Sequence, residues 1–230
     1  MNDPQQGIPP LEIQGRAVTG RSDLPPIDWA AEDARVADEY RQESQLRAKR
    51  ELAKVLPPRY VDATTEEPDL LSWADQLAKV DMTNGPAKGP SLLLLGVTGV
   101  GKTHAAIGAL RRYVAAGGDA TPVLSTAPDL YAELRPKAGK SQDAGLERFM
   151  HAKLLMLDDL GAAKASEWVE EINYRLVNHR YNAMLPTIFT SNVPPRDLGA
   201  ALGERVASRL TGMCRPVVLK GLDRRRGRTD

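Results

Sequence analysis

Uncharged apolar runs and helix-like apolar spacing alternate along residues 91–220 of this 230-residue chain. Short apolar runs between turn residues predict buried strands, and longer segments with apolar positions three and four apart predict helices. The expected strands are 91–95, 122–126, 153–158, 186–191 and 215–220. The expected helices are 102–116, 128–136, 143–151, 166–184 and 200–212. Because this alternation is typical of a parallel sheet covered on both faces, we predict a three-layer α/β fold with a five-stranded parallel sheet.

The residues before this sheet have a different pattern. Residues 1–27 contain five prolines and three glycines with scattered charge, which predicts a disordered tail. Residues 28–80 predict a helical partner-binding region and linker, with Asp28 as the N-cap of a helix that stops at Pro57. A second helix is expected over 70–79.

The first of these helices has a broken apolar stripe. Its members are Trp29, Val36, Tyr40, Leu52 and Leu56. So narrow a stripe fits the groove of a partner protein, and it fits equally a solvated helix that lies on the following domain.

Charge, cysteine content and apolar runs indicate the cellular compartment in which we expect the protein and the kinds of contact it can make. The 31 basic and 30 acidic residues give a net charge of +1, so any contact with nucleic acid must be local. Cys214 is the only cysteine, which indicates a reducing compartment and excludes a disulfide framework. Neither a signal peptide nor a run of membrane-spanning length is evident. We expect a cytoplasmic protein with no membrane contact.

The octapeptide from Gly96 to Thr103 fits the P-loop pattern of Gly, four residues, then Gly-Lys-Thr. It lies between an expected strand and an expected helix, where backbone N–H groups, the helix N-terminus and Lys102 together attract phosphate. The alternative is an ordinary tight turn between strand and helix. The pattern favours a site for ATP, whose candidate residues are Gly96, Thr98, Gly99, Val100, Gly101, Lys102, Thr103 and His104.

Two further apolar strands end in polar residues. Asp158 and Asp159 follow one strand, where Asp158 with Thr103 would hold Mg²⁺ and Asp159 would act as general base on the attacking water. Asn192 follows the other and would hydrogen-bond the γ-phosphate or orient that water. The alternatives are a solvated turn for the aspartates and a capped turn for Ser191 and Asn192.

Arg205 and Arg209 are four residues apart, on one face of an expected helix. Such a pair is either a solvated face or the source of an arginine finger directed at another subunit's nucleotide.

These motifs, in this order, resemble the AAA+ ATPases of the DnaC/IstB group, which includes bacterial and phage replicative helicase loaders. The similarity covers roughly residues 54–226, and its narrower signals are Pro-Pro-Arg-Tyr at 57–60 and Asp-Asp-Leu-Gly at 158–161. The resemblance implies an AAA+ P-loop ATPase domain over residues 90–226, without a full C-terminal lid.

The resemblance also implies roles. Lys102 and Thr103 would be Walker A, Asp158 and Asp159 Walker B, and Asn192 sensor I. Arg209 would be the arginine finger and Arg205 its supporting partner. Sensor II would be one of Arg224, Arg225 and Arg226, of which Arg225 aligns best; the alternative is a basic disordered tail.

The function implied is that of an ATP-dependent helicase loader. It would bind ATP and Mg²⁺ between subunits of a homo-oligomer, bind a hexameric replicative helicase through the N-terminal helix, and deliver it to single-stranded DNA. The basic stretch 135–140 is either a DNA contact or a solvated loop. The alternatives are an IstB-like transposition-helper ATPase and a P-loop small-molecule kinase.

Overall fold

The computed structural model describes residues 12–13, 16–17, 28–80, 82, 88–135, 142–221 and 223. The chain divides into two compact units, Met1–Ala37 and Asp38–Asp230. In the first unit, strands β1 (Glu12–Ile13) and β2 (Arg16–Ala17) pair antiparallel. The rest of the predicted tail over residues 1–27 lies outside the described residues.

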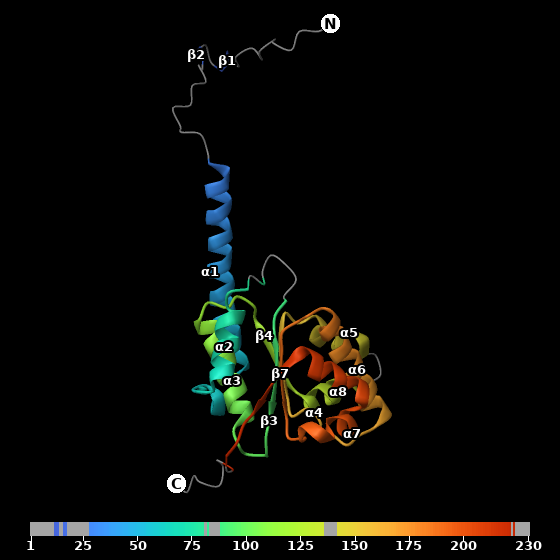
Figure 1. Cartoon of the computed structure of the whole chain (residues 1–230). Helices are drawn as coiled ribbons and strands as arrows, with labels where there is room; N and C mark the ends of the chain where they lie inside the picture. The colour runs from blue at the N-terminus through green and yellow to red at the C-terminus, as the bar shows by residue number, and fades with distance from the viewer. Residues whose placement is uncertain are drawn as a thin grey trace. The chain divides into compact units, whose positions relative to one another are not determined.

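The second unit is built on a parallel sheet (Figure 1). In the described chain it has five strands in the order β4-β5-β6-β3-β7, and every neighbouring pair is parallel. The strands are β3 (Ser91–Leu95), β4 (Pro122–Thr126), β5 (Leu154–Asp158), β6 (Thr187–Ser191) and β7 (Cys214–Val218). The predicted five-stranded parallel sheet is confirmed, and each strand lies within two residues of its expected position.

Helices cover both faces of this sheet, as the sequence predicts. Figure 1 shows α2 and α3 on one face and α4 to α8 on the other. The helices are α1 (Trp29–Val55), α2 (Pro68–Leu77), α3 (Lys102–Ala115), α4 (Ala127–Leu134), α5 (Gln142–His151), α6 (Glu167–Asn182), α7 (Leu198–Leu202) and α8 (Glu204–Met213). Two 3₁₀ turns, η1 (Pro58–Tyr60) and η2 (Pro195–Asp197), precede α2 and α7.

The central strand β3 shows how one sequence run serves two cores. All five of its residues are buried. Successive side chains of a strand point to opposite faces. Leu92 and Leu94 accordingly pack in the core with α2 and α3, and Leu93 and Leu95 in the core with α4 to α8. An uninterrupted apolar run is therefore required here rather than an alternating one.

Helix α1 carries two apolar faces instead of the single broken stripe expected. Trp29, Val36 and Tyr40 are 68%, 52% and 53% exposed, whereas Ala48 and Leu52 are buried in the second unit's core. The spacing of the first three places them on one helix face, and Leu52 falls on another. The C-terminal part of α1 therefore packs on its own domain, and the face with Trp29, Val36 and Tyr40 is exposed.

The N-terminus of α1 is capped as predicted. The carboxylate of Asp28 accepts hydrogen bonds from the backbone N–H groups of Ala30 and Ala31, at 3.1 and 3.2 Å. These bonds satisfy donors that the first turn of a helix leaves without partners.

One helix differs from its prediction. The segment expected as a helix over 200–212 is divided into α7 and α8 by Gly203, whose φ is +88°. A left-handed residue cannot continue a right-handed helix, and glycine is the residue that adopts it at low cost. No helix in the described ranges has the length and apolar character needed to cross a bilayer.

Candidate functional site

The strand order brings the predicted site residues together at one sheet edge. Strand β6 lies between β5 and β3. Because the strands are parallel, their carboxyl ends meet at the same edge. Asp158 and Asp159 at the end of β5, and the P-loop after β3, therefore flank Asn192, which follows β6.

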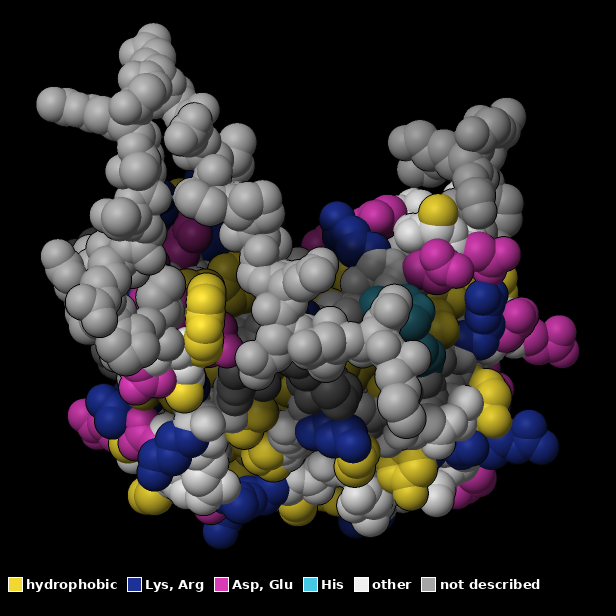
Figure 2. Space-filling model, turned by 90° about the horizontal axis from the view of Figure 1, so that it is seen from above, with side chains coloured by type: hydrophobic (Ala, Val, Ile, Leu, Met, Phe, Trp, Pro, Cys, Tyr) yellow, Lys and Arg dark blue, Asp and Glu magenta, His cyan; other side chains and the backbone are white. Residues whose placement is uncertain are grey.

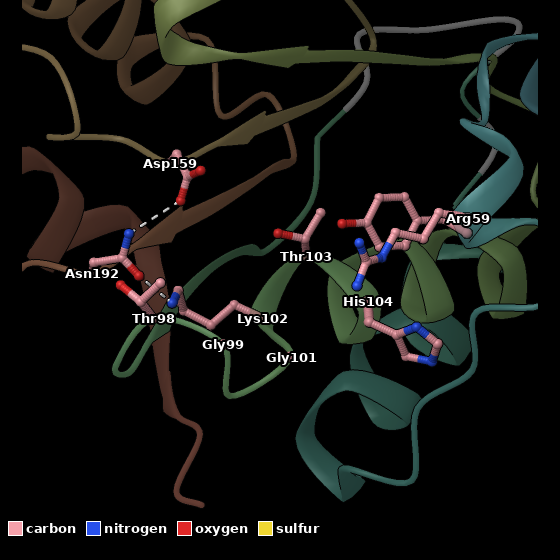
Figure 3. Close-up of a pocket in the computed structure, with 10 residues that line it drawn as sticks. Arg59, Thr98, Gly99, Gly101, Lys102, Thr103, His104, Asp159 and Asn192 are labelled. Carbon is pink, nitrogen blue, oxygen red and sulfur yellow. Dashed lines mark hydrogen bonds between the residues drawn. The ribbon is translucent and has the colours of Figure 1, made fainter. Parts of the chain in front are cut away.

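The P-loop forms one wall of a cavity of about 320 Å³ (Figure 3). The lining residues are Arg59, Tyr60, Thr98, Gly99, Gly101, Lys102, Thr103, His104, Asp159 and Asn192. Val100, by contrast, has its side chain buried in the core, so only its backbone is available to a phosphate. The loop thus presents backbone and small polar groups to the cavity.

All three glycines of the loop, Gly96, Gly99 and Gly101, have positive φ angles. The φ angles of Gly99 and Gly101 are +84° and +105°. Gly99 is also closely approached from the C-terminal segment, since a β-carbon built on it would lie 1.9 Å from Asp223 Oδ1. Any other residue at position 99 would be strained by this φ angle, and the Asp223 side chain would have to move to make room for it.

Lys102 points back over the loop. Its Nζ donates to the carbonyl oxygens of Gly96 and Val97, at 2.9 and 3.1 Å, and to Asn192 Oδ1 at 2.5 Å. The residue is 5% exposed, so protein acceptors, these three among them, take the place of water around the ammonium group. The three contacts hold a positive charge at the cavity wall.

Asp158 is the buried acid of the site. Its Oδ2 accepts from Thr103 Oγ1 at 2.9 Å, and its Oδ1 accepts from Thr190 Oγ1 at 2.6 Å. Burial raises the pKa of Asp158, while the hydrogen bonds from Thr190 and Thr103 act in the opposite direction. A bound cation would relieve this cost of burying a negative charge. The hydroxyl of Thr103 and the carboxylate of Asp158 are oxygen ligands of the kind that Mg²⁺ prefers.

Asp159 has a different environment although it is adjacent in sequence. It has a left-handed backbone, with φ +56°, and its N–H donates to Thr190 Oγ1 at 3.0 Å. Its carboxylate lines the cavity and accepts from Asn192 Nδ2 at 3.2 Å (Figure 3). Asn192 therefore connects Asp159 to Lys102 through its two amide atoms.

The family of the chain follows from a comparison with known proteins. Residues 30–226 match the model of a family described as IstB-like ATP binding protein. The chain belongs to this family. Its match spans most of the sequence, which confirms the resemblance predicted from the motifs.

Individual relatives of this IstB-like protein fall into two groups. It is 31% identical over 159 residues to the replicative helicase loader DnaI of Bacillus subtilis (strain 168), covering 62% of this chain and 50% of DnaI. It is 30% identical over 154 residues to the insertion sequence IS21 ATP-binding protein of Pseudomonas aeruginosa, covering 59% of this chain and 57% of that one. The chain therefore spans about half the length of the curated relatives it matches.

A solved structure agrees on the fold. The crystal structure of the DnaC helicase loader superimposes with a TM-score of 0.60 at 27% identity, over 71% of this chain and all (100%) of that one. The predicted P-loop α/β architecture of the IstB-like protein is thereby confirmed.

The predicted arginines lie away from the cavity. Arg209 lies 4.9 Å, and Arg205 5.9 Å, from the ring centroid of Tyr174 on α6, and neither lines the cavity. Arg225, the expected sensor II residue, lies outside the described residues, as do Arg224 and Arg226. The IstB-like site in one copy of the described chain thus contains no contribution from the predicted arginine finger.

Three residues of the site had no role predicted from sequence. Arg59 and Tyr60 line the cavity from η1, and Thr190 connects both aspartates through Asp158 Oδ1 and the N–H of Asp159. The only signal for the first two was the Pro-Pro-Arg-Tyr segment, which marks the family without indicating a place in space. Thr190 lies within an apolar strand, two residues before Asn192, and no local pattern marks it as part of the site.

Proposed function

We propose that this protein is an ATP-dependent replicative helicase loader, which binds and hydrolyses ATP between subunits, binds a hexameric helicase and delivers it to single-stranded DNA. The observation that supports it most is that the predicted arginine finger does not line the nucleotide cavity of its own copy. One copy supplies the phosphate-binding and water-activating residues, whereas Arg209 is held on a different surface. The similarity of the chain to proteins named as helicase loaders supports helicase loading as the use of this ATPase site.

The hydrolytic step assigns one task to each residue. Lys102 would exchange its carbonyl acceptors for phosphate oxygens. Mg²⁺, held by Thr103 and Asp158, would neutralise phosphate charge when bound. Asp159 takes the proton of a water that attacks the γ-phosphorus, while Asn192 fixes the carboxylate. The bond between the γ-phosphorus and the bridging oxygen breaks, and the products are ADP and phosphate.

The base of the nucleotide would lie towards η1. Arg59 extends into the cavity from this turn, beside His104 of α3 (Figure 3). His104 Nε2 also accepts a hydrogen bond from the backbone N–H of Thr64, at 3.3 Å, which ties the segment after η1 to the start of α3. Tyr60 offers the aromatic surface of this end of the cavity.

A subunit-mixing experiment tests the shared site. An Arg209→Ala protein keeps its P-loop and serves as acceptor, and a Lys102→Ala protein keeps Arg209 and serves as donor. Each alone should lose ATP hydrolysis, by on the order of 10³-fold for Arg209→Ala. Recovery in the mixture would support a site shared between subunits. Absence of recovery would contradict it and favour a site that acts within one chain, as in a small-molecule kinase.

The exposed face of α1 is the proposed contact with the helicase. Trp29, Val36 and Tyr40 present apolar surface there, which favours a partner protein. Deletion of the helix is unsuitable as a test because it would remove the buried Ala48 and Leu52.

Point variants avoid that problem. The double variant Trp29→Glu/Tyr40→Glu should lose co-purification with the host replicative helicase in the presence of ATP, with nucleotide binding intact. Leu46→Glu is the matched control, because Leu46 is 56% exposed on another face of the same helix. If the double variant retains the helicase as well as Leu46→Glu does, the helicase does not bind this face of α1.

A local surface is proposed for DNA. On the face seen in Figure 2, basic and acidic side chains are interspersed, in agreement with a net charge of +1. A hollow between the end of α4 and the start of α6 combines Arg135 and Lys164 with the half-buried aromatic Trp168, while Tyr131 beneath it is buried. Basic and aromatic groups together suit single-stranded nucleic acid. Of the predicted stretch 135–140, only Arg135 is among the described residues.

A second candidate function is an IstB-like transposition helper. It is favoured by the relative from insertion sequence IS21, whose identity and coverage are close to those of DnaI. ATP-dependent filaments on duplex DNA, with no binding to the helicase, would support this function over loading.

A further inference from the structure

The guanidinium of Arg209 is held in place by several partners. Its Nε donates to Asn178 Oδ1 at 2.7 Å, its Nη1 to the carbonyl oxygen of Arg205 at 3.1 Å, and its Nη2 to the hydroxyl of Tyr174 at 3.4 Å. The group also lies 4.9 Å from the centroid of the Tyr174 ring. A long, half-buried arginine side chain is thereby fixed in one geometry on the surface of α8.

The side-chain partners come from one neighbouring helix. Tyr174 and Asn178 are four residues apart in α6, so they lie on the same helix face. Tyr174 is half-buried and packs against the core beneath α6 and α8, which makes its ring a firm platform. The guanidinium of Arg205 lies 5.9 Å from the same ring centroid.

We propose that Tyr174 and Asn178 are positioning residues that hold Arg209 ready for the nucleotide of a neighbouring copy. This inference rests on the proposed function, in which Arg209 acts in trans. A free arginine side chain loses roughly 2 kcal/mol of rotamer entropy when it is fixed. Fixing it beforehand removes that cost from the transition state, because the geometry already exists when the subunits meet.

The contacts leave donors for a phosphate. A guanidinium has five N–H groups. The hydrogen bonds to the described residues use three of them, one each on Nε, Nη1 and Nη2. One N–H therefore remains on each Nη, which suffices for a bidentate contact with phosphate oxygens.

The test places the same change on either side of the shared site. Asn178→Ala or Tyr174→Leu is introduced into the donor, the Lys102→Ala protein that supplies Arg209. In parallel, each change is introduced into the acceptor, the Arg209→Ala protein that holds ATP. The ATPase rate and KM of the mixtures are measured, together with nucleotide binding by each acceptor alone.

We expect an asymmetric result. In the donor, either change should lower the restored rate about tenfold or more, the size expected for a lost hydrogen bond to a charged group, with KM unchanged. In the acceptor, neither change should matter. Tyr174→Phe removes the 3.4 Å hydrogen bond but retains the ring beside the guanidinium, so it should lower the rate less than Tyr174→Leu does. Asn182→Ala, an exposed asparagine at the end of the same helix, is the matched control and should have no effect in either position.

Other outcomes overturn the proposal. Equal losses in donor and acceptor would show that Tyr174 and Asn178 act through local packing. Full activity in both positions would show that Arg209 needs no positioning. Failure of the parent mixture, Lys102→Ala with Arg209→Ala, would reject the shared site itself, and it would be seen before any α6 variant is mixed.

Discussion

At the scale of single residues, Asp158 and Asp159 show how neighbours in sequence acquire different chemistry. Asp158 is 8% exposed and accepts hydrogen bonds from two threonine hydroxyls. Asp159 turns its carboxylate into the cavity through a left-handed backbone. The first is therefore suited to hold a cation and the second to accept a proton.

This difference predicts separable variants. Asp159→Asn should bind Mg-ATP as the parent protein does but hydrolyse it at least about 100-fold more slowly, because the general base is lost. Asp158→Asn should instead weaken binding of Mg-ATP relative to ATP in the presence of a chelator. Titration with a fluorescent nucleotide and steady-state ATPase assays measure the two effects. An ATPase rate of Asp159→Asn equal to that of the parent protein would show that Asp159 is not the general base.

His179 predicts a dependence of stability on pH. Burial, together with the nearby His151 and Arg180, lowers the pKa of His179 below 6.5. As pH falls through 6.5, the unfolded chain takes up a proton at this position before the folded protein does. Stability therefore falls with pH in that range. His179→Gln should show a smaller loss of melting temperature between about pH 7.5 and pH 5.

The control for this experiment is Asn182→Gln, which changes a non-titrating residue on the same helix. Its pH profile should match that of the parent protein. If the melting temperature of His179→Gln falls with pH as steeply as that of the parent protein, other groups cause the acid sensitivity.

At the scale of elements, the sequence predicted the three inner strands β3, β5 and β6 because each is a short apolar run that is buried on both faces, and the edge strands β4 and β7 because they continue the alternation of strands and helices. Leu92 to Leu95 fill two cores at once, as the alternating side chains of a buried strand do. The break at Gly203 was missed, since a single glycine within an otherwise helical pattern gives no sign of its φ angle. Local sequence patterns also do not reveal the order of the strands in the sheet. That order places β6 between β5 and β3, which is why Asn192 bridges Lys102 and Asp159.

The residues of the site were likewise predictable where they belong to local motifs, and not where tertiary packing brings them together. The P-loop and the two aspartates are local motifs with a fixed spacing. Arg59 and Tyr60 reach the cavity only through the packing of η1 beside α3, which tertiary structure determines. The contacts of Tyr174 and Asn178 with Arg209 join two helices for the same reason.

A buried arginine fixes the junction of α5, α6 and β6. Arg180 is fully buried and donates to Thr187 Oγ1 and to the carbonyl oxygens of Phe149, Met150, Ala152 and Pro186. Burial lowers the pKa of Arg180 to about 9, so it remains charged at neutral pH. Its carbonyl acceptors include the last turn of α5, where a cation is favoured.

Arg180→Met should therefore destabilise the protein by about 3 kcal/mol, because buried carbonyl groups lose their donor. Urea denaturation measures the difference. Arg175→Met, on the same helix, is the matched control, since its ion pair with Asp143 is largely exposed, and it should cost about 0.5 kcal/mol or less. Similar values for both variants would contradict a structural role for Arg180.

At the scale of the whole molecule, the proposed sharing of the site between copies would couple nucleotide state to assembly. A ligand that contacts two copies stabilises their association by mass action. Asp159→Asn should accumulate as an ATP-dependent oligomer, because it binds but does not hydrolyse the nucleotide. Light scattering after size-exclusion chromatography measures the assembly with ATP and with ADP. Arg209→Ala is the control and should assemble less; equal assembly with both nucleotides would contradict the coupling.

The negatively charged carboxylate of Asp223 lies against Gly99, in the loop that is expected to bind phosphate. A triphosphate bound at this turn would lie near a like charge, so we expect the carboxylate to lower the affinity for ATP. Asp223→Asn should consequently tighten ATP binding several-fold, most visibly at low salt. Asp197→Asn, at the exposed turn η2, should leave the affinity unchanged.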